Sequence, residues 1–426
     1  MIKETFKDID VDVYYEELEN GLRVYLAPFK NRKNYRINYF TRYGAEINEF
    51  VPHGEKKKIK VPYGVAHFLE HKVFEQETGE DPFSFFAKSG CDANASTGYK
   101  TTSYTVNGSK NIEENLEFLL NYVNSPYFTD KNVEKEKGII IQEINMYKDE
   151  PEGKLFDHSN KAIFQKHPCR IDIGGTEKSV RSITKETLYQ CYNTFYQPSN
   201  MYLVITGGFD VDKVMEVVRN NEKLNSKESK KPIKRKRVNE PESVRKSKEV
   251  LNIANLSKPK MVLTYKSKVD RSDEKESMKQ SIALEILLHH YFGSSSTFRE
   301  EMLNNNLMTF MYTSKDFVDD ILLVEIVAES DNVEKLSEET MKRMKNFDIT
   351  KEDVERIKKV MIANHVYGSD KPGSVMGMII SGLVAFNKPV YNAIDIIKEL
   401  TIEDIKKANN VIGFNNYTLI IGKPKE

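Results

Sequence analysis

The chain has 426 residues, a length that predicts two or three domains rather than one. Lys plus Arg and Asp plus Glu both number 64, so the formal net charge is zero and a strongly basic nucleic-acid-binding protein is not indicated. Three scattered cysteines exclude a disulfide framework, and the longest apolar run, residues 378–386, is too short to span a bilayer. At the start of the chain, residues 1–17 lack the apolar core of a secretory signal, so we expect a cytoplasmic location.

Strands and helices are both predicted along the chain. Alternating apolar and polar residues, typical of strands, occur at 22–29, 35–44 and 101–109. Helical periodicity occurs at 64–77, 82–89, 111–123, 130–148, 184–195, 275–292, 296–306, 333–346, 350–367 and 402–410. Because the two kinds of element interleave without strict alternation, the sequence predicts an α+β fold rather than a doubly wound parallel sheet.

The two halves of the chain resemble each other. TDKNVEKEKGIIIQE (129–143) overlies TKEDVERIKKVMIAN (350–364) at an offset of 221, and shorter matches keep the same order at offsets of 216 to 221. We interpret this pattern as an internal duplication that produces two homologous domains, each a mostly antiparallel sheet packed with helices. The alternative is that generic helices merely look alike.

A basic segment is predicted to join the halves. Residues 223–248 hold eleven Lys or Arg against three Glu and almost nothing apolar. Such a run could bind nucleic acid or act as a localisation tag, but its position favours a solvated linker. We therefore expect an N-terminal domain at 1–222 and a C-terminal repeat domain at 249–426.

The stretch GVAHFLEHKVFE (64–75) carries the clearest chemistry. His67 and His71 are four positions apart, so on a helix both imidazoles can reach one Zn²⁺ ion. Glu70 projects beside them and can take a proton from a zinc-bound water as a general base. The order H-x-x-E-H is the inverted zinc-peptidase motif. The alternative is a pair of ordinary helix histidines.

A catalytic zinc site normally takes a third protein ligand. Glu143 lies in the apolar run 139–144, where a free carboxylate is costly to bury and a metal would offset that cost. Glu136 lies two turns earlier on the same face and is predicted to support the site, although a solvated surface position fits equally well.

The second half offers an independent comparison. At the offset of 221, Asn364 takes the place of Glu143. His289 and His290 fall near the position of the histidine pair, but adjacent residues point to different helix faces. The C-terminal domain is therefore predicted to lack the metal and to help enclose the substrate.

These residues resemble the insulinase (pitrilysin) family of zinc metallopeptidases, the inverzincins, and especially its short bacterial processing peptidases that work as paired subunits. PYGVAHFLEHKVFE (62–75) is similar to the family's zinc helix, and EKEKGIIIQEINMY (134–147) to the helix with its third ligand. The resemblance assigns zinc binding to His67, His71 and Glu143, base catalysis to Glu70, and support of the site to Glu136.

The resemblance also implies how a substrate binds. Substrates of the family add a strand to the edge of the first domain's sheet, and residues 90–106 resemble that edge strand. Asn94 and Ala95 are the expected substrate contacts. An ordinary edge strand would have the same sequence pattern.

One departure from the family concerns an arginine and a tyrosine that hold the substrate and the developing oxyanion. The expected region, 319–330, has no arginine, and neither Arg299 nor Tyr312 fits the position. We therefore expect a dimer, with an identical or a related chain, whose partner supplies the pair. The predicted function is that of a zinc-dependent endopeptidase that hydrolyses peptides or short unfolded segments, and a peptide-maturation protease is one such enzyme. The alternative is a non-catalytic peptide-binding or assembly subunit of a related complex.

Overall fold

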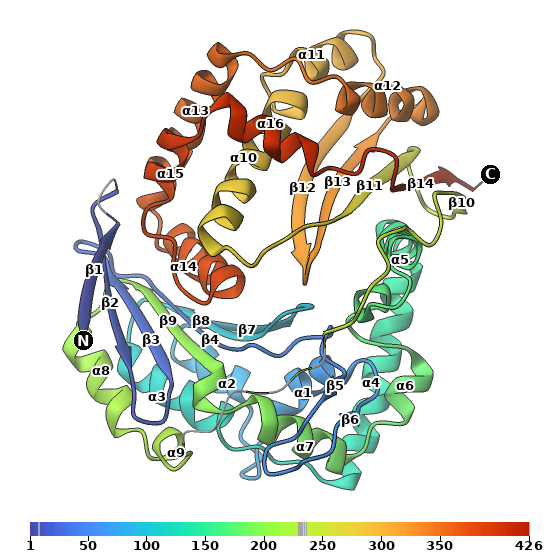
Figure 1. Ribbon diagram of the computed structural model, residues 1–426. Coiled ribbons are helices and arrows are strands. Elements are labelled where there is room, and N and C mark those ends of the chain that lie inside the picture. The colour runs from blue at the N-terminus through green and yellow to red at the C-terminus, as the bar shows by residue number, and fades with distance from the viewer. Residues whose placement is uncertain (7–8, 229–232, 234, 236, 426) are drawn as a thin grey trace. The chain divides into compact units, whose positions relative to one another are not determined.

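The computed structural model describes residues 1–6, 9–228, 233, 235 and 237–425, which form two compact units (Figure 1). The first unit comprises Met1–Ile144, Ile171–Lys236 and Val366–Asn392, and the second comprises Asn145–Arg170, Arg237–His365 and Ala393–Glu426. The units therefore differ from the contiguous domains 1–222 and 249–426 expected from the sequence, because each unit contains a segment from the other half of the chain.

A mixed seven-stranded sheet is the centre of the first unit. Its strand order is β1-β2-β3-β9-β4-β8-β7, and all neighbours are antiparallel except β3 and β9. The strands are β1 (Ile2–Phe6), β2 (Val11–Glu17), β3 (Arg23–Pro28), β4 (Tyr35–Thr41), β7 (Asp92–Thr97), β8 (Thr102–Gly108) and β9 (Met201–Gly207), with a separate ribbon of β5 (Glu49–Phe50) and β6 (Ile59–Lys60).

Helices cover both faces of this sheet. They are α1 (Val65–Val73), α2 (Pro82–Lys88), α3 (Ile112–Val123), α4 (Asp130–Asp149), α6 (Glu177–Arg181), α7 (Lys185–Phe195), η3 (Pro198–Asn200), α8 (Val211–Asn220), α9 (Glu222–Asn225) and α14 (Pro372–Phe386). Alternation along β4 explains the two layers: Tyr39 packs in the core under α1, α3 and α7, whereas Phe40 faces Ile379 and Leu383 of α14. α14 packs on the second face, against β3, β4 and β9 (Figure 1).

The second unit repeats this plan on a smaller scale. Its five-stranded sheet has the order β10-β14-β11-β13-β12. The strands are β10 (Lys248–Ile253), β11 (Lys260–Lys268), β12 (Phe310–Val318), β13 (Ile321–Glu329) and β14 (Tyr417–Pro424). The helices are α5 (Pro151–Ile163), η2 (Pro168–Arg170), α10 (Glu274–Phe292), α11 (Thr297–Asn304), α12 (Val333–Lys345), α13 (Lys351–Ser369), α15 (Ala393–Glu399) and α16 (Ile402–Asn410).

The strand orders confirm the predicted duplication. β10-β14-β11-β13-β12 matches β3-β9-β4-β8-β7 strand for strand, including the single parallel pair. The helices that follow are exchanged: α5 continues from α4 and packs on the second sheet, whereas α14 continues from α13 and packs on the first. They begin at Pro151 and Pro372, which are again 221 positions apart. This exchange is the physical reason why the units are not contiguous in sequence.

The predicted linker, residues 223–248, is more ordered at its end than its composition suggests. Glu240 is only 1% exposed, and its Oε1 lies 2.7 Å from Nζ of Lys266. The carboxylate also accepts the backbone N–H groups of residues 165–167. The end of the segment is therefore part of the second unit's interior, whereas residues 229–232, 234 and 236 lie outside the described residues.

The apolar run 378–386 lies within α14, whose buried side chains include Val375, Ile379 and Leu383. Its hydrophobicity is explained by packing on the sheet. Among the described residues, no helix has the length and apolar character needed to cross a bilayer.

Candidate metal centre

A close backbone approach fixes the start of α1, the helix that carries the histidine pair. Gly64 precedes the helix with φ 89°, and a Cβ there would lie 2.3 Å from the carbonyl oxygen of Gly174. Gly175, with φ 84°, approaches the carbonyl of Tyr63 in the same way. Only glycine satisfies both the positive φ and the lack of space. The sequence therefore anchors α1 against the loop at 174–175.

The apolar face of α1 orients the histidines. Phe68 and Leu69 are fully buried in the core of the first unit, whereas His67 and His71 are partly exposed, with 14% and 25% of their side chains accessible. Their ring centroids are 4.6 Å apart. The spacing of four positions thus places both imidazoles on one side of the helix, as the sequence predicts.

Glu143 of α4 meets this pair. Its Oε1 lies 3.7 Å from Nε2 of His67, and its Oε2 lies 3.4 Å from Nε2 of His71. One ligand atom from each of the three residues falls within 4.8 Å of the others. The carboxylate expected from a distant helix is therefore beside the imidazoles.

These distances suit a shared ion better than direct hydrogen bonds. They exceed the ordinary N–H···O range of about 2.7–3.2 Å. They fall close to the roughly 3.3–3.6 Å that separates two ligands in tetrahedral coordination at about 2.0–2.2 Å from Zn²⁺. Two imidazoles and a carboxylate are also a donor set that zinc accepts in catalytic sites. The residues present therefore fit zinc.

Glu136 of α4 holds His71 from the other side. Its Oε1 lies 3.0 Å from Nδ1 of His71, which directs Nε2 toward Glu143. A hydrogen bond to the second ring nitrogen is the usual support of a metal-binding histidine. Nδ1 of His67, in contrast, is buried and has no hydrogen-bond partner within the described part of the chain. Glu136 is thus hydrogen-bonded to His71 and only 13% exposed, and its support of a metal site stays a prediction.

The two imidazoles differ in their affinity for protons. Burial, helped by the neighbouring His71, lowers the pKa of His67 to about 4. Burial also lowers the pKa of His71, but the hydrogen bond to Glu136 and the charges of Glu136, Glu143 and Glu70 outweigh it, so this pKa is raised. Without a metal, the site thus has one imidazole that stays neutral and one that readily takes a proton.

Glu70 lies on the same helix, and its carboxylate is held by the strand β7. Burial raises the pKa of Glu70, and a hydrogen bond from Thr97 partly opposes that effect. Thr97 donates from Oγ1 to Oε2 at 2.5 Å. Sequence reasoning overlooked Thr97, although alternation in the strand places it on the same face as Ala93 and Ala95.

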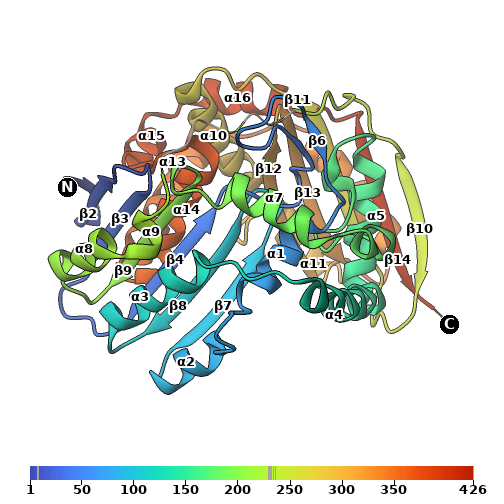
Figure 2. The same cartoon turned by 90° about the horizontal axis from the view of Figure 1, so that it is seen from below.

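β7 forms the open edge of the first sheet, beside β8 (Figure 2). Asn94 and Ala95 lie in the middle of this strand. The side-chain Oδ1 of Asn94 accepts the N–H of Ala95 at 2.8 Å. The expected substrate contacts therefore lie on a strand that has a free edge and ends at Thr97, next to Glu70.

The described residues of the second unit differ from the metal centre at the corresponding positions. Asn364, the counterpart of Glu143, is exposed on α13, and His290 pairs with Asp348 at 2.8 Å. Among its described residues, the second unit by itself brings no three metal-ligating side chains together. That the C-terminal repeat lacks a metal site stays a prediction from the sequence.

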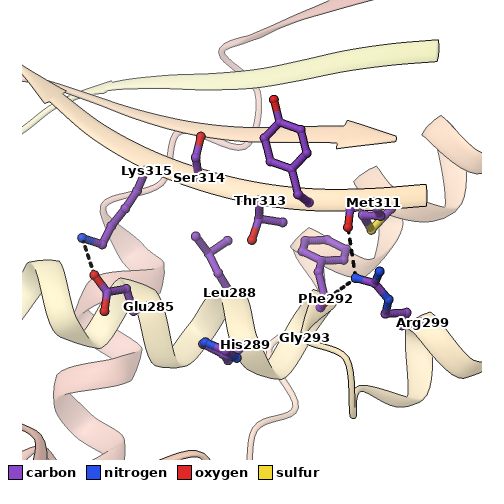
Figure 3. A pocket seen from close by; sticks show the side chains of 11 residues that line it. Glu285, Leu288, His289, Phe292, Gly293, Arg299, Met311, Thr313, Ser314 and Lys315 are labelled. Atoms are coloured by element: carbon purple, nitrogen blue, oxygen red, sulfur yellow. Dashed lines mark hydrogen bonds and ion pairs between the residues drawn. The ribbon is translucent and has the colours of Figure 1, made fainter. Parts of the chain in front are cut away.

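A cavity of about 440 Å³ lies instead between α10 and the edge strand β12 of the second unit (Figure 3). His289 lines it, and Lys315 lies 3.0 Å from Glu285 on its wall. The guanidinium of Arg299 donates to two backbone carbonyls, those of Phe292 and Met311. Arg299 is therefore committed to the main chain around the cavity.

Comparisons with known proteins identify the family of this chain. The model of the insulinase family (peptidase family M16) matches residues 50–177, and that of the M16 inactive domain matches residues 182–361. The chain is 36% identical over 407 residues to YmfH, an uncharacterized zinc protease of Bacillus subtilis (strain 168), with 94% of each chain covered. It is 24% identical over 177 residues to the mitochondrial-processing peptidase subunit beta of Caenorhabditis elegans, covering 41% of this chain and 39% of that protein.

A solved structure gives the same answer for the whole chain. The crystal structure of an M16-like peptidase from Alicyclobacillus acidocaldarius superposes with a TM-score of 0.90 at 30% identity, covering 97% of this chain and 99% of that one. Both the sequence comparison and the fold comparison therefore relate nearly the full length of this chain to M16 proteins. The chain belongs to the insulinase family, peptidase family M16.

Proposed function

We propose that this protein is a zinc-dependent endopeptidase that hydrolyses peptides or short unfolded segments together with a partner subunit. The convergence of His67, His71 and Glu143 within 4.8 Å carries the proposal. When bound, Zn²⁺ supplies Lewis acidity that polarises a carbonyl and acidifies water.

The remaining chemistry falls to Glu70. Thr97 occupies its Oε2, which leaves Oε1 to take a proton from the attacking water and deliver it to the leaving amine. Burial raises the pKa of Glu70, which makes its carboxylate a better proton acceptor than an exposed one. Glu136 keeps His71 in the tautomer whose Nε2 faces the metal position.

The open edge of β7 supports binding of an extended peptide as an added strand. Main-chain pairing along Asn94 and Ala95 would lead the scissile bond toward Thr97 and Glu70. Such pairing tolerates many side chains and excludes folded segments, because a folded segment cannot offer a free strand. The substrate class is therefore flexible peptide.

Two observations support a partner subunit. Residues 319–330 offer no arginine, and Arg299 is held by backbone carbonyls instead of being free to contact a substrate. A relative of this chain is by name a subunit, the mitochondrial-processing peptidase subunit beta. We infer that a second, related or identical chain contributes the arginine and tyrosine for the oxyanion, and that the isolated chain is a weak peptidase.

Cleavage of an unstructured peptide tests the proposal, with the purified chain assayed alone and with candidate partners. Zinc-dependent cleavage that rises on addition of a partner and is abolished in Glu70→Gln supports it. Glu77→Gln is the matched control, since Glu77 is exposed and lies seven positions farther along. Tight zinc binding without cleavage under any pairing would instead indicate a non-catalytic peptide-binding or assembly subunit.

A further inference from the structure

Lys72 is a charged residue at a core position of α1. It follows His71 directly, lies on the buried face of the helix and is 0% exposed. Its Nζ is paired with the carboxylate of Glu75 and donates to the backbone carbonyl of Asn132 on α4 at 3.5 Å. A buried ammonium is costly unless carboxylates and carbonyls surround it, so these contacts constrain where α4 can lie.

Lys72 also contacts the carboxylate that supports the metal centre. Oε2 of Glu136 lies 3.8 Å from Nζ of Lys72, while Oε1 of the same group lies 3.0 Å from Nδ1 of His71. Glu136 is only 13% exposed. A carboxylate bridged between two donors in a largely buried position has little freedom to rotate.

The contacts of Lys72 with α4 also influence where Glu143 lies. Glu136 follows Asn132 by four positions, and Glu143 follows Glu136 by seven. All three residues therefore share one face of the helix. The contacts of Lys72 with Asn132 and Glu136 therefore limit how far α4 can slide along its axis relative to α1. The same register places the carboxylate of Glu143 opposite the two imidazoles.

We propose that Lys72 is a positioning residue of the metal centre: it holds Glu136 against His71 and fixes the register between α4 and α1. This role rests on the proposed zinc function. The competing explanation is that Lys72 only stabilises the end of α1. Its partner Glu75 lies three residues farther along the chain, so this pairing alone would give Lys72 a structural role and no effect on the metal centre.

A double-mutant cycle on zinc affinity separates the two explanations. Lys72→Met, Glu136→Gln and the double variant are compared in the full chain by competition with a zinc chelator, with folding checked by circular dichroism. We expect Lys72→Met to weaken zinc binding about tenfold in the native background, as supporting residues of metal sites do. In the Glu136→Gln background the same change should cost less than twofold.

Glu75→Gln is the matched control, since it removes the other partner of Lys72 and leaves Glu136 in place; we expect less than a twofold change. Equal losses in both backgrounds, or no loss in a folded Lys72→Met protein, would overturn the positioning role. If Lys72→Met does not fold, Lys72→Gln, which keeps an amide donor for Asn132, takes its place in the cycle. A native chain that binds no zinc refutes the proposed function itself, whereas zinc binding without coupling refutes only the role of Lys72.

Discussion

Thr97 donates a 2.5 Å hydrogen bond from Oγ1 to Oε2 of Glu70, and this bond joins the edge strand β7 to the metal-binding helix α1. The strand expected to receive the substrate therefore also holds the expected base. A shift of the strand on substrate binding would therefore change the position of the Glu70 carboxylate.

Replacing Thr97 by valine should impair catalysis without removing zinc. The hydrogen bond lowers the pKa of Glu70, so its loss should move the acid limb of the kcat/KM profile to higher pH. Because a hydrogen bond to a charged group contributes about 1.5–3 kcal/mol, kcat/KM at neutral pH should fall roughly tenfold or more. Thr97→Ser, which keeps the hydroxyl, should retain most activity. An unchanged pH profile in Thr97→Val would show that this bond does not act on the base.

Zinc affinity should depend on pH through a single proton. The pKa of His71 is raised, so zinc must displace its proton as the pH falls below that value, whereas His67, with a pKa of about 4, is already neutral. We therefore expect the affinity to fall about tenfold for each pH unit between pH 6 and 5. Chelator competition across this range provides the measurement. A dependence on two protons would mean that both imidazoles are protonated in the metal-free protein.

Glu240 should stabilise the second unit only above acidic pH. Burial raises its pKa, but Lys266 and three backbone N–H groups outweigh that effect, so its pKa is lowered in the folded protein. A lowered folded-state pKa gives stability that is present above the unfolded value near 4.5 and is lost as the pH falls further. Glu240→Gln leaves Lys266 buried without its counter-charge, which costs about 3 kcal/mol at pH 7.

Urea unfolding of Glu240→Gln and the native chain at pH 7 and at pH 3.5 tests this linkage. The difference in the free energy of unfolding should be large at pH 7 and clearly smaller at pH 3.5. A difference independent of pH would show that the ionised carboxylate is not what stabilises the site.

Gly64→Ala should destabilise the metal centre through the backbone. The added Cβ would lie 2.3 Å from the carbonyl oxygen of Gly174, at a residue whose φ is 89°. We expect a lower Tm and weaker zinc binding, because α1 must move to relieve the contact. Gly138→Ala on α4 is the control: nothing lies within 4 Å of its added Cβ, and alanine should stabilise the helix by about 0.5–1 kcal/mol. Normal zinc binding by Gly64→Ala would contradict the anchoring role of this loop.

Much of the fold was predictable because local periodicity reports local structure. Each predicted helix corresponds to a helix in the structure, and both α4 and α13 begin one residue after the threonines that open the repeat alignment, Thr129 and Thr350. The exchange of α5 and α14 was not predictable, because an amphipathic pattern shows that a helix has a buried face and not which sheet covers it.

The candidate site shows the same limit. The spacing of His67 and His71 is a local feature and was sufficient to predict a shared face. Thr97 and Lys72 act through contacts between elements distant in sequence, with Glu70 and with Glu136 respectively. The clue to Lys72 was a lysine on the apolar face of a helix, where burial requires a partner. The cytoplasmic location and the identity of the partner subunit stay predictions from the sequence.

The number and tightness of bound zinc ions test the central claim most directly. The native chain and a Glu143→Gln variant are loaded with Zn²⁺, dialysed against a weak chelator and analysed by mass spectrometry of the metal. Glu134→Gln is the control on the same helix, since Glu134 is exposed and pairs with Lys137. We expect one tightly held zinc in the native and control chains and at least a hundredfold weaker binding in Glu143→Gln. One equivalent held as tightly by Glu143→Gln as by the native chain would contradict the account.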